Sequence, residues 1–345
     1  MATMATMATI RTSAPGKLFL LGEYAVLDGA PALLIAVDRR VDVTIDESRS
    51  GNWQVSTPGL GIEGLILEDE GRLPAGLDPR RRMQLRLFEA VREAVLSRVS
   101  RVPRPLMISI DSSALSRDGH KLGLGSSAAV ASALTAGLAR TAGLALNREA
   151  VCDLAMAAHR KAQGGAGSGG DVAASVYGGL IRYQRGTAPT PLSWPGELTI
   201  MAVVTGDGAR TTDLVRRVTD YAKSDPSKYR DDVTRLTLLA EQAQRALSDP
   251  SLFLRLASDY FAALVVLDGH ARAGIVSEFH LALHALAERE GGVFKSSGAG
   301  GADVGLAFSH RGKPTERLAA ALAQAGAEVV PLGFGAGGLQ YGSGS

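Results

Sequence analysis

Three glycine-rich segments of this chain each carry polar or charged side chains that could take part in chemistry on a bound ligand. The first, residues 121–128 (KLGLGSSA), runs into an alanine-rich stretch that predicts a helix beginning at Ser126 or Ser127. A helix N-terminus attracts anions through its N–H groups and its dipole, and glycines let the backbone approach a ligand closely. The segment therefore indicates a phosphate-binding loop whose hydroxyl caps the helix or binds Mg²⁺.

A simpler structural interpretation of this loop is a serine N-cap that follows a glycine turn. The loop is not of the Walker type, because no Gly-Lys-Ser/Thr follows the glycines. The lysines favour the phosphate interpretation, because the chain has only seven of them against 30 arginines. Three of the seven, Lys17, Lys121 and Lys295, stand beside glycine-containing motifs, which favours a role in a site over solvent-exposed filler.

The two other glycine-rich segments each contain one acid. Residues 162–171 (AQGGAGSGGD) end in Asp171 and lead into a short apolar stretch. Asp171 either caps a short helix there or places a carboxylate at a reacting centre. Residues 295–303 (KSSGAGGAD) lead into a predicted strand, and they are either a tight loop between elements or part of the same site. The residues alone leave both alternatives open.

The spacing of apolar residues predicts the elements that position these segments. Strands are expected at residues 17–21, 32–37, 39–46, 106–110, 180–183, 198–204, 304–308, 328–332 and 339–341. Besides the helix after the first loop, helices are expected at residues 82–99, 148–161, 171–177, 213–222, 231–248, 251–268, 277–290 and 314–325. Residues 53–77 are expected to form a glycine-rich loop. Strands and helices mix in both halves, so the predicted fold class is α+β.

The length of the chain indicates more than one domain. Its 345 residues correspond to about two domains. Prolines at 189, 191 and 195 mark the boundary between a first domain at 10–192 and a second at 193–345. Residues 1–9 repeat Met-Ala-Thr and are expected to be a disordered start.

Charge and hydropathy exclude several classes of protein. The net charge of +2 argues against a histone-like or basic-tail nucleic-acid binder. No run of 18 apolar residues appears, which argues against a membrane span. No signal peptide is visible, and the one cysteine cannot form an internal disulfide. We expect a soluble cytoplasmic protein that acts on a small molecule, with no nucleic-acid or membrane partner.

Together with the N-terminal residues, the three segments resemble the motifs of the GHMP kinases. Residues 14–17 (APGK) and 22–27 (GEYAVL) are similar to the first motif of that family, residues 123–129 to the second and residues 297–303 to the third, in the family's order. The resemblance implies a nucleotide-binding N-terminal α+β domain and a ferredoxin-like C-terminal domain. It also implies ATP and Mg²⁺ as cofactors and transfer of the γ-phosphoryl group of ATP.

Within this family the chain is most similar to phosphomevalonate kinases. Gly22-Glu23-Tyr24 and residues 159–178 follow their pattern, whereas mevalonate kinases usually have His in the place of Tyr24. Mevalonate kinases would also carry a Mg²⁺-binding glutamate on the helix before the second glycine segment, and residues 151–161 contain none. The resemblance implies phosphorylation of (R)-5-phosphomevalonate to the diphosphate, in the mevalonate pathway of isoprenoid biosynthesis.

Several residues depart from the phosphomevalonate kinase pattern. Gly165 stands where a lysine is usual, Gly170 where a bulky residue is usual, Ser296 where proline is usual and Ala302 where glycine is usual. Two alternatives therefore stay open. One is a GHMP kinase that acts on an alcohol, such as mevalonate, homoserine or a sugar. The other is a non-catalytic GHMP-fold protein that binds a ligand as a regulator.

The resemblance also implies a role for each motif residue. Lys17 and Asp171 would be catalytic, and Ser127 would bind Mg²⁺. The residues expected to bind the nucleotide are Lys121, Gly123, Leu124, Gly125, Ser126, Ser127, Ala128, Gly298, Ala299 and Gly300. The residues expected to bind the acceptor are Glu23, Tyr24, Ser168, Gly169, Arg210 and Thr211. The protein is expected to be a monomer or a homodimer.

An acceptor that is itself a phosphate monoester brings about −1.5 to −2 charge into the cleft. Further cations are therefore expected near the motifs, and arginine forks suit phosphate best. The candidates are His120, Lys121, Arg160, Lys161, Arg182 and Arg210. Arg160 and Lys161 either face the cleft or form a solvated helix end.

Overall fold

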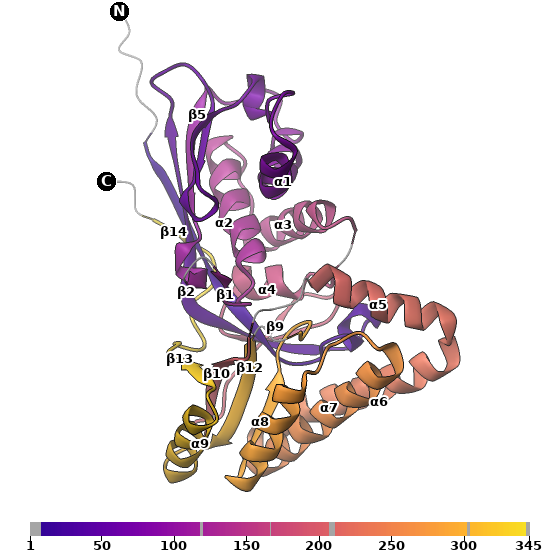
Figure 1. Cartoon of the computed structure of the whole chain (residues 1–345). Helices are drawn as coiled ribbons and strands as arrows, with labels where there is room; N and C mark the ends of the chain where they lie inside the picture. The colour runs from indigo at the N-terminus through magenta and orange to yellow at the C-terminus, as the bar shows by residue number, and fades with distance from the viewer. Residues whose placement is uncertain (1–7, 118–119, 166, 207–210, 302–303, 343–345) are drawn as a thin grey trace, which may run out of the picture.

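The computed structural model describes residues 8–117, 120–165, 167–206, 211–301 and 304–342. Two β-sheets, each covered by helices, organise these residues (Figure 1). The larger sheet and helices α1 to α4 come from residues 10–192, apart from the short strand β14 near the end of the chain, and the smaller sheet and helices α5 to α9 come from residues 198–330. The fold is α+β, as the sequence predicts.

The larger sheet is built around two long strands, β1 (Ile10–Leu21) and β2 (Ala32–Glu47). Its order is β14-β1-β2-β5-β3-β4, and β8 pairs with the first part of β2 and carries β9 at its other edge. The remaining strands of this sheet are β3 (Gln54–Thr57), β4 (Ile62–Ile66), β5 (Leu106–Asp111), β8 (Leu180–Tyr183), β9 (Thr190–Leu192) and β14 (Gln340–Tyr341). Apart from the parallel pair β3 and β5, these strands run antiparallel.

Four helices cover one face of this sheet: α1 (Pro79–Leu96), α2 (Ser126–Thr141), α3 (Arg148–Ala162) and α4 (Gly170–Tyr177). The central helix α2 consists largely of alanine and other small residues, and it is buried between the sheet and the neighbouring helices. Asp78 caps α1 and Asn147 caps α3 by accepting hydrogen bonds from backbone N–H groups of the first turn. Small side chains let α2 lie close to the sheet, as Gly137 does beside Thr12 of β1 and Ile45 of β2.

The smaller sheet has the strand order β11-β12-β10-β13. Its strands are β10 (Leu198–Val204), β11 (Gly292–Ser296), β12 (Val304–His310) and β13 (Glu328–Val330). Along the chain, helices α5 to α8 lie between β10 and β11, and α9 lies between β12 and β13. This strand order with these connections is the ferredoxin-like arrangement. Alternate residues of β10 face opposite sides, with Met201 and Val203 toward α8 and α9 and with Ile200 and Ala202 toward the main core.

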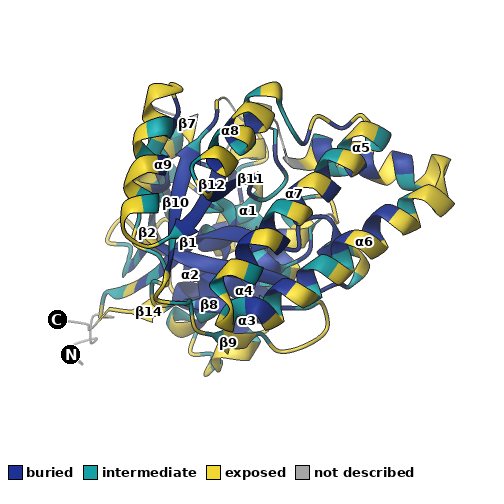
Figure 2. Cartoon of the chain, turned by 90° about the horizontal axis from the view of Figure 1, so that it is seen from below, coloured by how far each residue is buried: buried dark blue, intermediate teal, exposed yellow. Residues whose placement is uncertain are grey.

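The helices of this half are α5 (Thr211–Ser224), α6 (Pro226–Arg245), α7 (Pro250–Ala271), α8 (Glu278–Arg289) and α9 (Lys313–Gln324). In Figure 2 the strands at the centre are buried, whereas the far ends of α5 and α6 project and are mostly exposed. By length and composition alone, α7 could cross a membrane, but half of its most apolar stretch is buried inside the fold. Residues such as Phe253 and Tyr260 account for its apolar character as a core helix.

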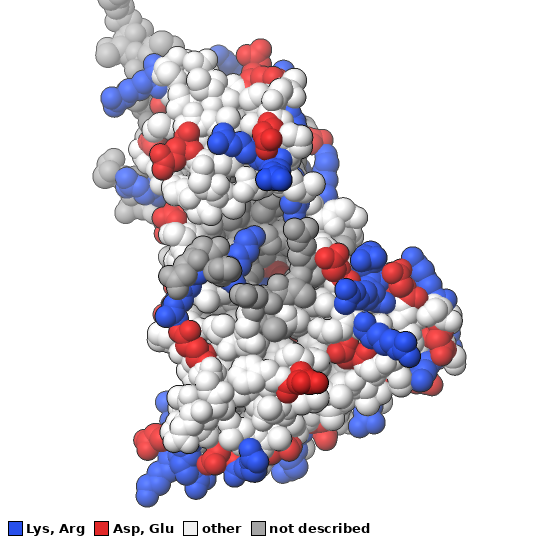
Figure 3. All heavy atoms as spheres, viewed as in Figure 1, with Lys and Arg blue, Asp and Glu red and all other residues white. Residues whose placement is uncertain are grey.

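Short connecting elements complete the chain. The pairs of residues in β6 (Ser116–Arg117) and β7 (His120–Lys121) form a small antiparallel ribbon before the first glycine loop. Single turns of 3-10 helix are η1 (Ala25–Asp28), η2 (Pro58–Leu60), η3 (Asp69–Gly71), η4 (Ser113–Leu115) and η5 (Ala246–Ser248). In Figure 3, basic and acidic side chains intermingle over the face shown, which agrees with the small net charge.

The structure differs from the sequence predictions at several places. Residues 53–77 contain the hairpin of β3 and β4 rather than only a loop. The strand β11 was not predicted, and it leads directly into the third glycine segment. The predicted boundary at residue 192 falls between β9 and β10, but the chain returns near its end, where β14 pairs with β1 of the larger sheet. Residues 1–7 of the expected disordered start lie outside the described residues, while Thr9 donates a hydrogen bond to Asp46.

Candidate active site

The structure brings Lys17 and Asp171 together. Lys17 Nζ lies 3.3 Å from Asp171 Oδ1, with the lysine side chain almost fully buried and the carboxylate about one-third exposed. Lys17 comes from β1, just after a break in the β1–β2 register at Gly16. Gly16 is required there, because a Cβ would lie 2.7 Å from the carbonyl oxygen of Leu124. At this break β1 lies against the first glycine loop, and the Lys17 side chain lies beside Asp171.

Asp171 does not cap the helix that it opens. The N-cap of α4 is Gly169, in a left-handed conformation with φ of +92°. The hydroxyl of Ser168 accepts a hydrogen bond from Gly170 N at 3.2 Å, and the carbonyl of Ser168 accepts one from Tyr183 at 2.7 Å. The alternative in which Asp171 caps the helix is therefore wrong. Ser168 was expected to bind the acceptor, and its buried hydroxyl is directed toward the start of α4.

The first glycine loop ends as the sequence predicts, with α2 beginning at Ser126. Its N-cap, Gly125, has φ of +76°, and its carbonyl accepts hydrogen bonds from Ala128 N and Ala129 N. Leu124 O accepts a hydrogen bond from Lys17 N at 2.8 Å. A Cβ on Gly125 would lie only 2.6 Å from Lys17 Cε. The loop, the start of α2 and Lys17 therefore form one fitted unit with a helix N-terminus at its centre.

A histidine that sequence reasoning gave no role lies against Ser127. Ser127 Oγ is 3.0 Å from His159 Nε2, and the same nitrogen is 3.0 Å from Gln163 Nε2. Burial lowers the pKa of His159, Asp171 acts in the opposite direction and Lys17 acts in the same direction as burial. The neutral ring can therefore accept a hydrogen bond from the Ser127 hydroxyl. His159 and Gln163 are four residues apart, so they lie on one face of a helix. This spacing is the feature of the sequence from which their contact could have been predicted.

The third glycine segment lies on the first motif. Ser297 Oγ accepts a hydrogen bond from Phe19 N at 3.0 Å and donates one to Phe19 O at 2.9 Å. The Tyr24 hydroxyl donates to Ala299 O at 2.6 Å. Tyr24 has φ of +61°, which is strained for a residue with a side chain. Gly298 faces open space, since a Cβ there would meet nothing within 4 Å.

Glu23, which was expected to bind the acceptor, has its side chain in the core of the fold. Its side chain is 1 % exposed, and its Oε1 lies 2.5 Å from Nζ of Lys295, which is fully buried. Burial raises the pKa of Glu23, and the charge of Lys295 opposes that shift. The carboxylate is directed into the core, where among the described residues it pairs with Lys295 of β11.

The remaining expected residues fall into three groups. Lys121 is exposed at the end of the β6–β7 ribbon, beside the first loop. Lys161 pairs with Glu93 at 2.7 Å on the surface, as a solvated helix end does. Arg210 lies outside the described residues, and Thr211 is the first residue of α5. In the part of the chain that the structure describes, no group of three or more His, Cys, Asp or Glu residues could hold a metal ion by itself.

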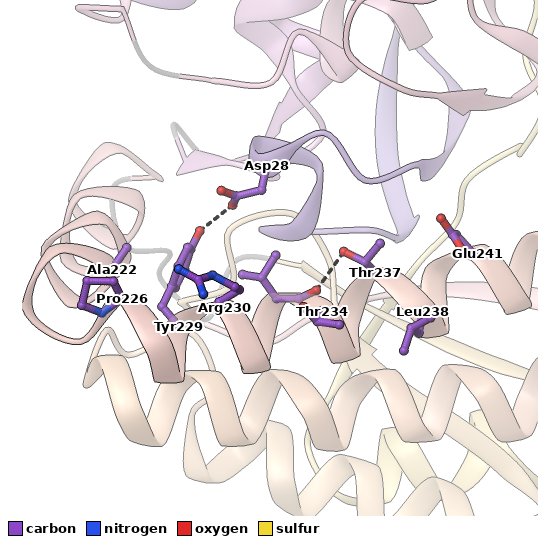
Figure 4. Close-up of a pocket in the computed structure, with 10 residues that line it drawn as sticks. Asp28, Ala222, Pro226, Tyr229, Arg230, Thr234, Thr237, Leu238 and Glu241 are labelled. Carbon is purple, nitrogen blue, oxygen red and sulfur yellow. Dashed lines mark hydrogen bonds between the residues drawn. The ribbon is translucent and has the colours of Figure 1, made fainter.

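A surface pocket of about 560 Å³ lies beside the end of the first motif, because Asp28, the next residue of η1, is part of its lining. Figure 4 shows it between η1 and α6, where the hydroxyl of Tyr229 donates a hydrogen bond to Asp28 Oδ2 at 2.5 Å. Its lining combines two acids, one arginine, threonine hydroxyls and apolar side chains, and it includes none of the residues expected to bind or react. The chemistry-bearing residues therefore gather instead around the N-terminus of α2.

Comparison with known proteins identifies the relatives of this chain. The family model for the GHMP kinases N terminal domain matches residues 86–179. A phosphomevalonate kinase of Streptomyces sp. (strain CL190) is 35% identical over 342 residues, covering 87% of this chain and 90% of that protein. A mevalonate kinase of Pyrococcus horikoshii is 32% identical over 211 residues, covering 61% of each chain.

Solved structures show the same fold. The Lin0012 protein from Listeria innocua matches with a TM-score of 0.86 and 25% identity, covering 97% of this chain and all of that one. The Streptococcus pneumoniae phosphomevalonate kinase, solved in complex with phosphomevalonate and AMPPNP, matches with a TM-score of 0.76 and 21% identity, over 95% of this chain and all of that one. These likenesses extend over nearly the whole chain, so they include both sheets.

Proposed function

The chain belongs to the GHMP kinases and is a phosphotransferase of the mevalonate-pathway type, and from this premise we propose that it transfers the γ-phosphoryl group of ATP to (R)-5-phosphomevalonate. One observation carries the proposal. Lys17 and Asp171, from distant parts of the chain, lie 3.3 Å apart beside the glycine loop that opens α2. A cation, a carboxylate and a helix N-terminus at one place are what phosphoryl transfer requires for positioning and for neutralising charge.

ATP fits the first glycine loop. The backbone amides of residues 123–128 and the start of α2 hold its phosphates, and the open side of Gly298 leaves room for the nucleotide. Mg²⁺ fits the donors that this site offers, the Ser127 hydroxyl and the Asp171 carboxylate. Both are hard oxygen ligands, and Mg²⁺ is usually held by one or two protein oxygens together with substrate phosphates. When bound, it offsets negative charge on the transferred group.

Lys17 and Asp171 have different roles in the proposed transfer. Lys17 places a positive charge between the donor and acceptor phosphates, where repulsion is greatest as the transferred group moves. A phosphate monoester has a second pKa of about 6 and is largely dianionic at pH 7, so the acceptor oxygen needs no general base. Asp171 therefore acts by holding Lys17 and by binding the metal, rather than by taking a proton.

Two features favour a phosphate over an alcohol as the acceptor. The relative with the broad 35% match is a phosphomevalonate kinase, whereas the mevalonate kinase match covers 61% of the chain. In addition, α3 presents His159 to Ser127, where the resemblance to mevalonate kinases would require a Mg²⁺-binding glutamate. A neutral histidine is consistent with a site in which other groups balance the metal's charge.

An ADP-release assay across phosphomevalonate, mevalonate, homoserine and galactose tests this proposal. We expect kcat/KM for phosphomevalonate to exceed that for each alcohol by at least ~100-fold. Lys17→Met, which keeps the length of the side chain without its charge, is the control for activity at this site. A preference for mevalonate would assign the chain as a mevalonate kinase. Binding of an ATP analogue in calorimetry without turnover of any acceptor would support a non-catalytic regulator instead.

A further inference from the structure

A buried ion pair joins the first motif to the strand that precedes the third glycine segment. Lys295 Nζ lies 2.5 Å from Glu23 Oε1, and the two side chains are 0% and 1% exposed. Glu23 lies in the turn after β1, and Lys295 lies on β11, 272 residues later. Neither side chain takes part in the phosphoryl-transfer chemistry proposed above, so the pair needs another explanation.

The surroundings of the pair are apolar except for a few directed contacts. Lys295 Nζ also donates to Ser296 O at 2.5 Å and lies 5.9 Å from the centre of the Tyr260 ring. The Tyr260 hydroxyl donates to Glu23 O at 2.8 Å. Burial raises the pKa of Glu23, and the charge of Lys295 lowers it. Oε2 of that carboxylate has no hydrogen-bond partner among the described residues.

Stability alone does not explain two charges at this position. Removing two charges from water costs as much as their attraction returns, and well-packed apolar residues of similar size are often equally stable there. Buried charges differ from apolar residues because a buried charge that loses its partner is strongly destabilising, so an ion pair favours one arrangement of the two segments that carry it. Two residues after Lys295, Ser297 is hydrogen-bonded to Phe19, and Ala299 accepts a hydrogen bond from Tyr24. The ion pair therefore joins the same two segments of the chain just before these hydrogen bonds.

We infer that Glu23 and Lys295 are a positioning pair that fixes residues 297–301 against the first motif, so that the third glycine segment has one defined place beside the nucleotide. Loss of the charges allows β11 to shift relative to β1, and the segment then moves with it. The inference rests on the proposed function in one respect, which is that residues 298–300 border bound ATP. Its expected signature is a higher KM for ATP, with little change in KM for the acceptor.

A double-mutant cycle separates positioning from packing. Lys295→Met leaves Glu23 without its partner, and we expect Tm to fall by about 5–10 °C. Glu23→Met combined with Lys295→Met removes both charges, and we expect most of that loss of Tm to be recovered. In the double variant KM for ATP should nevertheless stay at least ~10-fold above wild type. Recovery of both Tm and KM for ATP would show that the pair only fills space, and would overturn the inference.

A second measurement does not depend on the double variant folding or on any substrate. In the isosteric variant Glu23→Gln, we expect amide hydrogen exchange of residues 297–301 to become at least ~10-fold faster, with exchange in α1 unchanged. Asp232→Asn is the matched control, because Asp232 is also buried and accepts a hydrogen bond from Tyr221 at 2.8 Å, far along the chain on α6. Unchanged exchange of residues 297–301 in Glu23→Gln, or an equal increase in Asp232→Asn, would overturn the inference. Failure of wild type to phosphorylate phosphomevalonate would overturn the proposed acceptor and leave this result standing.

Discussion

Gly125 satisfies two requirements at the level of a single residue. It caps α2 with φ of +76°, and its missing Cβ leaves room for the Lys17 side chain, which would otherwise be 2.6 Å away. The same absence lets a phosphate approach the amides at the start of the helix. The residue types of this loop were sufficient to predict a phosphate site, but the contact with Lys17 was not predictable from spacing, since it depends on the register break in β1.

Gly125→Ala should therefore displace Lys17 as well as crowd the phosphate loop. We expect kcat to fall by at least ~100-fold, about 2.7 kcal/mol of barrier, together with weaker binding of ATP in calorimetry. The matched control is Gly143→Ala, because Gly143 has nearly the same φ, +74°, and a Cβ there would meet nothing within 4 Å. Equal loss of activity in both variants would mean that backbone strain, and not the contact with Lys17, is responsible.

Asp171→Asn keeps the shape of the side chain and removes the charge that lies 3.3 Å from Lys17. We expect kcat to fall by at least ~100-fold, because Lys17 loses the partner that holds it. The acidic limb of kcat/KM should follow the acceptor phosphate, near pH 6, in wild type and in the variant alike. If a limb present in wild type disappears in Asp171→Asn, the carboxylate is acting as a general base on a hydroxyl, and the acceptor is an alcohol.

At the scale of elements, most helices were predictable within a few residues because each is long and shows a clear period. The strand β11 was missed because its sequence, GVFKS, contains a lysine, and only the burial of Glu23 beside it explains a lysine inside a core strand. The hairpin of β3 and β4 was missed because its strands are short and separated by a glycine-containing turn. Partners that are distant in the chain contribute in both cases, because Lys295 pairs with Glu23 and β3 pairs with β5 as well as with β4.

Helix α8 illustrates how an element can depend on pH. Ser277 and His280 form a capping box at its N-terminus, and His280 Nε2 lies 2.9 Å from Thr205 Oγ1. Burial, with a smaller contribution from Lys295, lowers the pKa of His280 to about 4. The folded protein therefore binds fewer protons than the unfolded chain between about pH 4 and 6.5, so stability is lost as the pH falls through that range.

His280→Gln should remove this pH dependence. We expect the free energy of unfolding of wild type to fall by up to about 3 kcal/mol between pH 7 and pH 4 because of His280. The variant should be less stable than wild type at pH 7 and should show a smaller decline toward pH 4 in urea unfolding. Parallel curves for the two proteins would show that His280 is not the group that titrates.

At the scale of the whole molecule, the end of the described chain is part of the larger sheet. Arg40 on β2 donates hydrogen bonds to Gly337 O and Gly338 O, both at 2.8 Å, as well as to Ser13 on β1. Glycine is required at 338, because a Cβ there would lie 2.3 Å from Val176 O. The prolines predict a division at residue 192, and a strand was predicted at residues 339–341, but its pairing with β1 was not predictable, because the partner strand lies at the other end of the chain.

Arg40→Ala should weaken the attachment of residues 334–342 to the larger sheet without changing the candidate active site. We expect a loss of about 1–3 kcal/mol in the free energy of unfolding, with faster proteolysis near residues 334–342 and an unchanged KM for ATP. Arg39→Ala is the control, because Arg39 makes one long contact, 3.4 Å to Ala114 O. A loss of stability in Arg39→Ala as large as in Arg40→Ala would contradict the assignment of this role to Arg40.

The pairing of β14 with β1 also has a consequence for biosynthesis. A ribosome adds about 5–20 residues per second, so roughly 7–30 s pass between the synthesis of β9 and that of β14. During that time the larger sheet has most of its strands, but one edge of β1 still lacks its neighbour. An exposed strand edge is a template for pairing with other chains, so we expect Thr12 and Ser13, the residues of β1 that β14 covers, to be open to such pairing while the second half of the chain is being made.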